Sequence, residues 1–105
     1  MKEQILHNLR TGEVRGVKVV QIKDYFFEGP TRCCAGGLAI LTAHPKIYFE
    51  GDDGMDPTGS TLKRIIWWRN YLPWDSGIQW IVAKMNNSGK TFAEIADWLE
   101  VNWNP

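Results

Sequence analysis

Two adjacent cysteines, Cys33 and Cys34, are the residues whose type and position most directly suggest chemistry in this sequence. Thr31 is a good N-cap residue, and a helix beginning after it would place both thiols in its first turn. Free N–H groups and the helix dipole favour a thiolate there. The stretch therefore predicts either a thiol enzyme or two small residues of an apolar core.

A cysteine nucleophile needs a base, which is commonly histidine, and the sequence has His7 and His44. His44 lies at the far end of the same predicted helix, about 15 Å away at 1.5 Å per residue, so it cannot pair with either thiol. His7 could pair only if the N-terminal helix folds against the cysteines. We favour packing, and keep Cys33 or Cys34 with His7 as the catalytic alternative.

Motifs for metals and phosphates are incomplete in this sequence. "SGKT" at 88–91 lacks the upstream glycine of a phosphate-binding loop. The acidic run at 51–56 lacks the alternating ligands of a calcium loop, and the cysteines and histidines lack zinc-site spacing. We expect no metal and no cofactor, and a solvated loop at 51–60.

Tryptophan is the unusual part of the composition, with six among 105 residues. Exposed tryptophans concentrate at interaction sites, and their rings can also stack on nucleobases. The alternative is that a small domain uses tryptophans to cover its own edges. The predicted partner-binding residues are Trp67, Trp68, Trp80, Trp98 and Val101.

The elements that position these residues begin with a short helix that ends near Gly12. Branched and aromatic residues then predict an antiparallel hairpin between 17–22 and 25–28, with Lys23-Asp24 as its turn. The cysteine helix follows and runs to about Ala43. It is apolar or small nearly all round, as a buried central helix is, and its glycines indicate a close backbone approach.

The second half predicts a strand at 47–50 and then a strand or a helix at 62–73, where branched residues and tryptophans favour the strand. Two capped helices follow. The second of these is an amphipathic helix that closes the core. The turn between them is "NNSG" at 86–89. The predicted structural caps are Thr31, Ser76, Gln79, Asn86, Asn87, Thr91 and Glu94.

Length and composition indicate one domain over residues 1–105, of the α+β class: a small antiparallel sheet packed on the central helix. Acidic and basic residues balance at 12 each, which disfavours direct nucleic-acid binding and DNA mimicry. The sequence has neither a membrane-spanning apolar run nor a signal peptide. We expect a cytoplasmic protein with reduced thiols and no membrane partner.

Three blocks, "NLRTGEVRGVKVV", "RCCAGGLAI" and "MNNSGKTFAEIADWLEVNW", resemble in content and order a group of small phage and prophage proteins. The block from Asn86 to Leu99 is the most specific. The sequence departs from the group's pattern at Ala35, where leucine is usual, and at Asn87, where aspartate is usual. An asparagine at that position favours a structural turn over a catalytic acid.

The resemblance implies a phage accessory role in the cytoplasm of an infected bacterial host, and no particular reaction. We expect binding more than catalysis. The expected function is inhibition of a host defence system, either by occupying a host protein, as an anti-CRISPR does, or by sequestering a small immune signalling nucleotide. The alternatives are a cysteine-dependent hydrolase and a homodimeric structural module joined through the tryptophan surface.

Overall fold

The computed structural model describes residues 1–28, 31–45 and 68–105. Its helices are α1 (Lys2–Thr11), α2 (Ala35–Ala43), α4 (Ser76–Asn87) and α5 (Phe92–Asn102). The predicted strand at 47–50, the loop at 51–60 and Trp67 lie outside the described residues. The described residues are mostly helical, with two small two-stranded sheets. The predicted α+β class is therefore confirmed, and the prediction of one antiparallel sheet is wrong.

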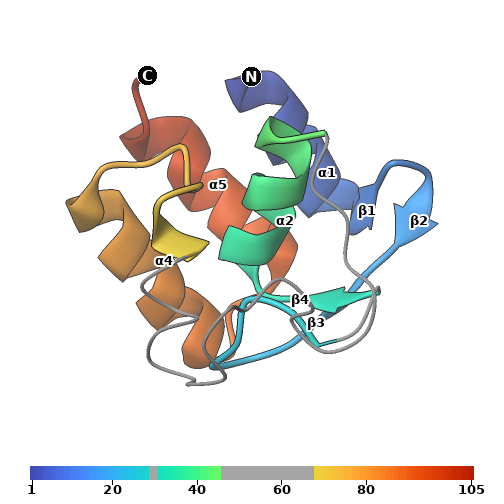
Figure 1. The fold of residues 1–105 in the computed structure, drawn as a ribbon. Coiled ribbons are helices and arrows are strands. Elements are labelled where there is room, and N and C mark those ends of the chain that lie inside the picture. Colours follow the sequence, from blue (N-terminus) through green and yellow to red (C-terminus); the bar gives the residue numbers. More distant parts are fainter. Residues whose placement is uncertain (29–30, 46–67) are drawn as a thin grey trace.

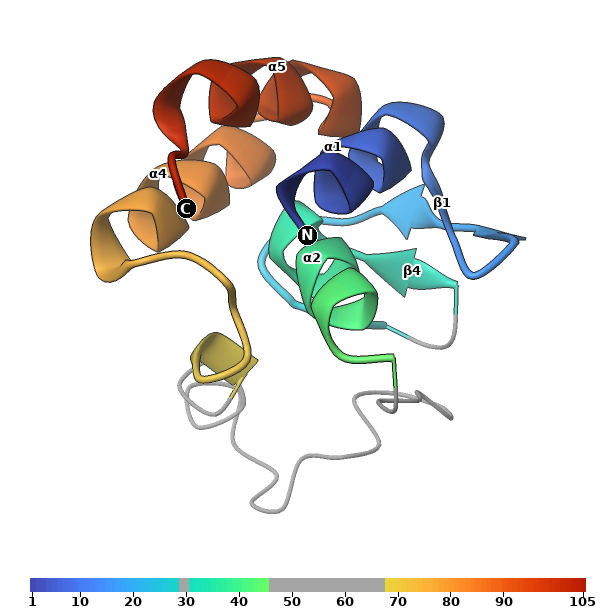
Figure 2. The same cartoon turned by 90° about the horizontal axis from the view of Figure 1, so that it is seen from above.

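Helix α2 packs against α1 and α4, and α5 packs against the same two helices (Figures 1 and 2). Helix α1 also lies along α5, and α4 and the β1–β2 hairpin stand at opposite ends of the molecule. Residues from all three helices α1, α2 and α5 are almost completely buried between them. We call this the apolar seam, and its central members are Ile5, Leu9, Leu38, Ile95 and Leu99.

The predicted central helix is confirmed, because every residue of α2 from Ala35 to Leu41 is buried. The close backbone approach is also present. A Cβ atom at Gly37 would come within 2.4 Å of the Phe26 carbonyl oxygen, a distance that no side chain tolerates. The glycine is therefore required where the 26–28 segment crosses α2.

The predicted hairpin at 17–28 is wrong. Strand β1 (Glu13–Val14) pairs antiparallel with β2 (Val17–Lys18), and the turn between them is Arg15-Gly16. Both turn residues have positive φ, as a two-residue type I′ turn requires, and Lys23-Asp24 is poorly suited to that geometry. The Arg15 guanidinium also donates hydrogen bonds to the carbonyls of Leu41 and His44 at the end of α2.

Strand β3 (Val20–Gln21) pairs in parallel with β4 (Arg32–Cys33). This pairing extends the chain through Cys33, so α2 can begin only afterwards. Cys34, and not Thr31, is the N-cap residue, and its Sγ accepts a hydrogen bond of 3.3 Å from the Gly37 N–H. The prediction that Thr31 caps this helix is therefore wrong.

Two further predictions of local structure in the second half are corrected. Asp75 caps α4 in place of Ser76, and Gln79 donates to the Trp74 carbonyl, so the predicted capping box there is absent. Trp68 and Arg69 form a helical turn, not a strand.

The capping box of α5 is confirmed. The Thr91 hydroxyl accepts from the Glu94 N–H, and the Glu94 carboxylate accepts from the Thr91 N–H. These hydrogen bonds lower the pKa of Glu94. Phe92, Ile95, Ala96 and Leu99 form the buried face of this amphipathic helix, as predicted.

Candidate functional site

Asn86 fixes α4 to the rest of the molecule. Its side chain is 2% exposed, and its Oδ1 accepts from Gln21 Nε2 at 2.8 Å and from the Ala35 N–H at 3.0 Å. Its Nδ2 donates to the Ile22 carbonyl at 2.8 Å and, more weakly, to Asn87 Oδ1 at 3.4 Å. The prediction that Asn86 caps the 86–89 turn is therefore wrong: Asn86 lies inside α4, and its Oδ1 accepts from the first N–H of α2.

Neighbouring amides extend these contacts. Asn87 Oδ1 accepts from the Asp24 N–H at 2.9 Å. Gln21 donates to the Lys90 carbonyl and accepts from the Phe92 N–H, which ties β3 to the start of α5. We call the group Gln21, Asn86 and Asn87 the amide latch. The contact needs only an oxygen acceptor at position 87, which asparagine and aspartate both supply.

The two cysteines lie in different environments. Cys33 in β4 is 1% exposed, and burial raises the pKa of its thiol, so it is core filler. Cys34 is half-buried and borders a pocket between α2 and α4. The expectation that both sulfurs fill a dry core is therefore right for Cys33 and wrong for Cys34.

The structure brings neither histidine to that pocket. His7 is exposed on α1, and His44 donates through Nε2 to the Tyr71 carbonyl at 2.9 Å. Among the described residues that line the pocket there is no histidine. The predicted pairing of a cysteine with His7 is therefore not assembled around Cys34.

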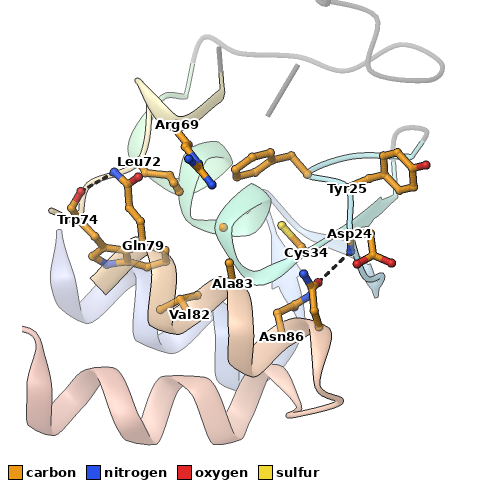
Figure 3. A pocket seen from close by; sticks show the side chains of 13 residues that line it. Asp24, Tyr25, Cys34, Arg69, Leu72, Trp74, Gln79, Val82, Ala83 and Asn86 are labelled. Carbon is orange, nitrogen blue, oxygen red and sulfur yellow. Dashed lines mark hydrogen bonds between the residues drawn. The ribbon is translucent and has the colours of Figure 1, made fainter. Parts of the chain in front are cut away.

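The α2–α4 pocket has a volume of about 150 Å³ (Figure 3). Four stretches supply its walls: residues 24–26, the start of α2, residues 69–74 and one flank of α4 from 79 to 87. Sequence reasoning missed it, because these stretches are distant along the chain. A weak signal was available, since Asn86 follows Ile78 and Val82 at helical spacing and is a polar residue in an apolar stripe.

The tryptophans divide into buried and exposed ones. Trp68 is 0% exposed and packs edge-on against Phe27, with ring centroids 4.8 Å apart, so its predicted partner-binding role is wrong. Trp74 and Trp103 also pack edge-to-face in the interior. Trp98 is half-buried against the core. Tryptophan thus fills this domain's own interior at several positions.

Trp80 and Val101 remain exposed, at 61% and 76% of their surfaces. The Lys84 ammonium lies 4.9 Å from the centroid of the Trp80 ring, one helical turn further along α4. This cation–π contact covers part of the Trp80 ring on a helix whose position Asn86 anchors.

Comparisons with protein families, with characterised proteins and with solved structures found no match to this chain. In the part of the chain that the structure describes, no cluster of histidine, cysteine, aspartate or glutamate could hold a metal ion. None of the described helices is long and apolar enough to cross a membrane.

Proposed function

We propose that this protein acts by binding, as a phage accessory protein that occupies a host protein of a defence system in the manner of an anti-CRISPR. The residues that suggested the phage resemblance support binding over catalysis. Asn86 and Asn87 make structural hydrogen bonds, the Thr91–Glu94 pair caps a helix, and Cys33 is core filler.

The exposed Trp80 ring carries this proposal. A large aromatic ring that is 61% exposed on an anchored helix loses little conformational entropy when a partner covers it. Tryptophan is also among the residues that contribute most to binding energy at interfaces. Lys84 beside the ring adds a positive charge at the rim, which favours a partner with acidic residues around an apolar centre.

The other proposed functions have less support. The hydrolase retains Cys34 as its thiol but has no histidine among the described residues of the pocket. Sequestration of a nucleotide by stacking on tryptophan cannot use Trp68, because its ring is buried. A homodimer joined through Trp80 is the remaining alternative, and sedimentation of the wild type and of Trp80→Ala at several concentrations distinguishes it.

The test is protection of a phage in bacteria that carry defined defence systems. We expect expression of the wild-type protein to restore plaque formation against at least one system, and Trp80→Ala to weaken binding to the target by roughly 30-fold, a loss of about 2 kcal/mol. Trp80→Phe should retain most of the effect. Val20→Ala, at an equally exposed apolar residue on β3, is the matched control.

Melting temperatures of all variants establish that the fold is intact. Protection by Trp80→Ala equal to that by the wild type would contradict the proposed surface. Failure of the wild-type protein against every system tested would contradict defence inhibition itself.

A further inference from the structure

The size of the α2–α4 pocket limits what it can hold. A cavity of about 150 Å³ accommodates a single benzene-sized ring. Sites that enclose an entire drug-sized ligand are larger, on the order of 300 Å³ or more. A ligand of this pocket therefore inserts one ring and leaves the rest of its structure at the mouth.

The walls of the pocket are suited to a flat ring. The side chains of Phe26, Leu72, Trp74 and Val82 contribute apolar surface from three sides, and Ala83 lies exposed at its edge. Phe26 and Leu72 are also close to Gly36, where an added Cβ would meet them at 2.9 and 3.4 Å. Apolar walls with a few polar groups are the usual composition of small-ligand sites.

Two amide side chains in the wall have unused hydrogen-bonding capacity. Asn87 uses its Oδ1 to accept, and its Nδ2 hydrogens have no acceptor among the described residues. Gln79 uses its Nε2 to donate to Trp74, and its Oε1 has no donor there. Gln79 and Asn87 lie two helical turns apart on α4, about 12 Å along its axis. One can therefore accept from one edge of a heteroaromatic base while the other donates to the opposite edge.

Arg69 supplies a positive charge at the pocket that no described residue neutralises. Its guanidinium points toward the pocket in Figure 3 and forms no ion pair with any described residue, although Arg10 and Arg32 each do. Asp24 is the one acidic residue among the described lining residues. An arginine at the mouth matches a phosphate or carboxylate by paired N–H donors.

We infer that this pocket binds a pyrimidine nucleotide through its single-ring base, with the base between the apolar walls and its phosphate at Arg69. The site goes beyond the proposed partner surface, because Trp80 does not line it. One base is the part that the pocket encloses, so mononucleotides are sufficient probes.

The experiment is calorimetric titration of the full chain with AMP, GMP, CMP and UMP, with the matching nucleosides, and with phenyl phosphate. We expect the better of CMP and UMP to bind with a Kd on the order of 0.1 mM, as its size allows. The nucleoside should bind roughly tenfold more weakly, because it lacks the phosphate that Arg69 recognises. Phenyl phosphate should bind more weakly than the nucleotide, because it cannot use Asn87 and Gln79.

Three variants locate the site. Ala83→Trp should fill the mouth and abolish binding, and its melting temperature shows whether the fold is retained, since Ala83 is exposed. Arg69→Gln should reduce nucleotide affinity to that of the nucleoside. Arg32→Gln, at an arginine outside the pocket, is the matched control and should bind as the wild type does.

Three results would overturn the inference. The first is no binding of CMP or UMP at several millimolar, and the second is equal affinity for nucleotide and nucleoside. The third is phenyl phosphate binding as tightly as the nucleotide, which would leave an anion site without base recognition. Loss of phage protection in Trp80→Ala with nucleotide binding retained would separate the two proposals.

Discussion

The apolar seam and the amide latch hold their helices in different ways. In the seam, five aliphatic side chains from α1, α2 and α5 are at most 1% exposed, and the attachment is apolar and non-directional. Helix α4 buries only Val82 and Asn86 completely, and three hydrogen bonds of Asn86 tie it to Gln21, Ile22 and Ala35. Because the hydrogen bonds of α4 are concentrated at Asn86, one flank of the helix can line the pocket and its outer face can expose Trp80.

The largest expected effect is the loss of an apolar side chain from the seam. Leu99→Ala should reduce the free energy of unfolding by about 3 kcal/mol, because it removes apolar contact and leaves a cavity where α5 faces α1. Urea denaturation followed by circular dichroism measures this change. All helices should lose stability together, since the seam joins three of them.

Ile78→Ala on the half-buried face of α4 is the matched control. We expect a loss of about 1 kcal/mol there, since half of the side chain is already in water. Equal losses at Leu99 and Ile78 would contradict the distinction between the two regions.

The next largest effect is expected at the latch. Asn86→Ala removes the partners of the Ala35 N–H, the Ile22 carbonyl and the Gln21 amide, and should cost about 2 kcal/mol. Unlike a seam substitution, it should loosen α4 selectively. Hydrogen exchange should accelerate at Ala35 and along α4 by more than in α1 and α5.

Asn87→Ala tests the outer member of the latch for comparison, because Asn87 is exposed and accepts only one hydrogen bond from another segment. It should cost about 0.5 kcal/mol. If Asn86→Ala destabilised the protein no more than Asn87→Ala, the latch would not be what positions α4.

Local rules predicted those parts of the fold that depend on neighbouring residues. The Thr91–Glu94 capping box and the buried stripe of α5 lie within a few residues of each other. The burial of α2 follows from its composition, because its residues are apolar or small on every side. The close approach at Gly37 was predicted as a property of the helix, although the segment that approaches could not be named.

Predictions failed where a distant segment decides the local structure. Strand β4 pairs with β3, whose residues lie twelve positions earlier; the pairing includes Arg32 and Cys33 and makes Cys34 the N-cap of α2. The partners of Asn86, which are Gln21, Ile22 and Ala35, are likewise more than fifty residues away along the chain. The pocket could not be predicted, because its walls meet only after α2 and α4 have packed together.

The last prediction changes stability least, because it alters no residue. It tests the two cysteines by chemical labelling of the folded protein with iodoacetamide. Cys34 borders the pocket and should react, whereas Cys33 is 1% exposed and should react only when the protein opens. Burial raises the pKa of Cys33, so its neutral thiol should remain protected even when the pH is increased from about 7 to about 9. Peptide mass spectrometry assigns each label, and labelling in urea is the positive control for Cys33. Equal rates at the two sulfurs in the native state would place Cys33 in contact with solvent, and the thiol-enzyme interpretation would then have two candidate nucleophiles instead of one.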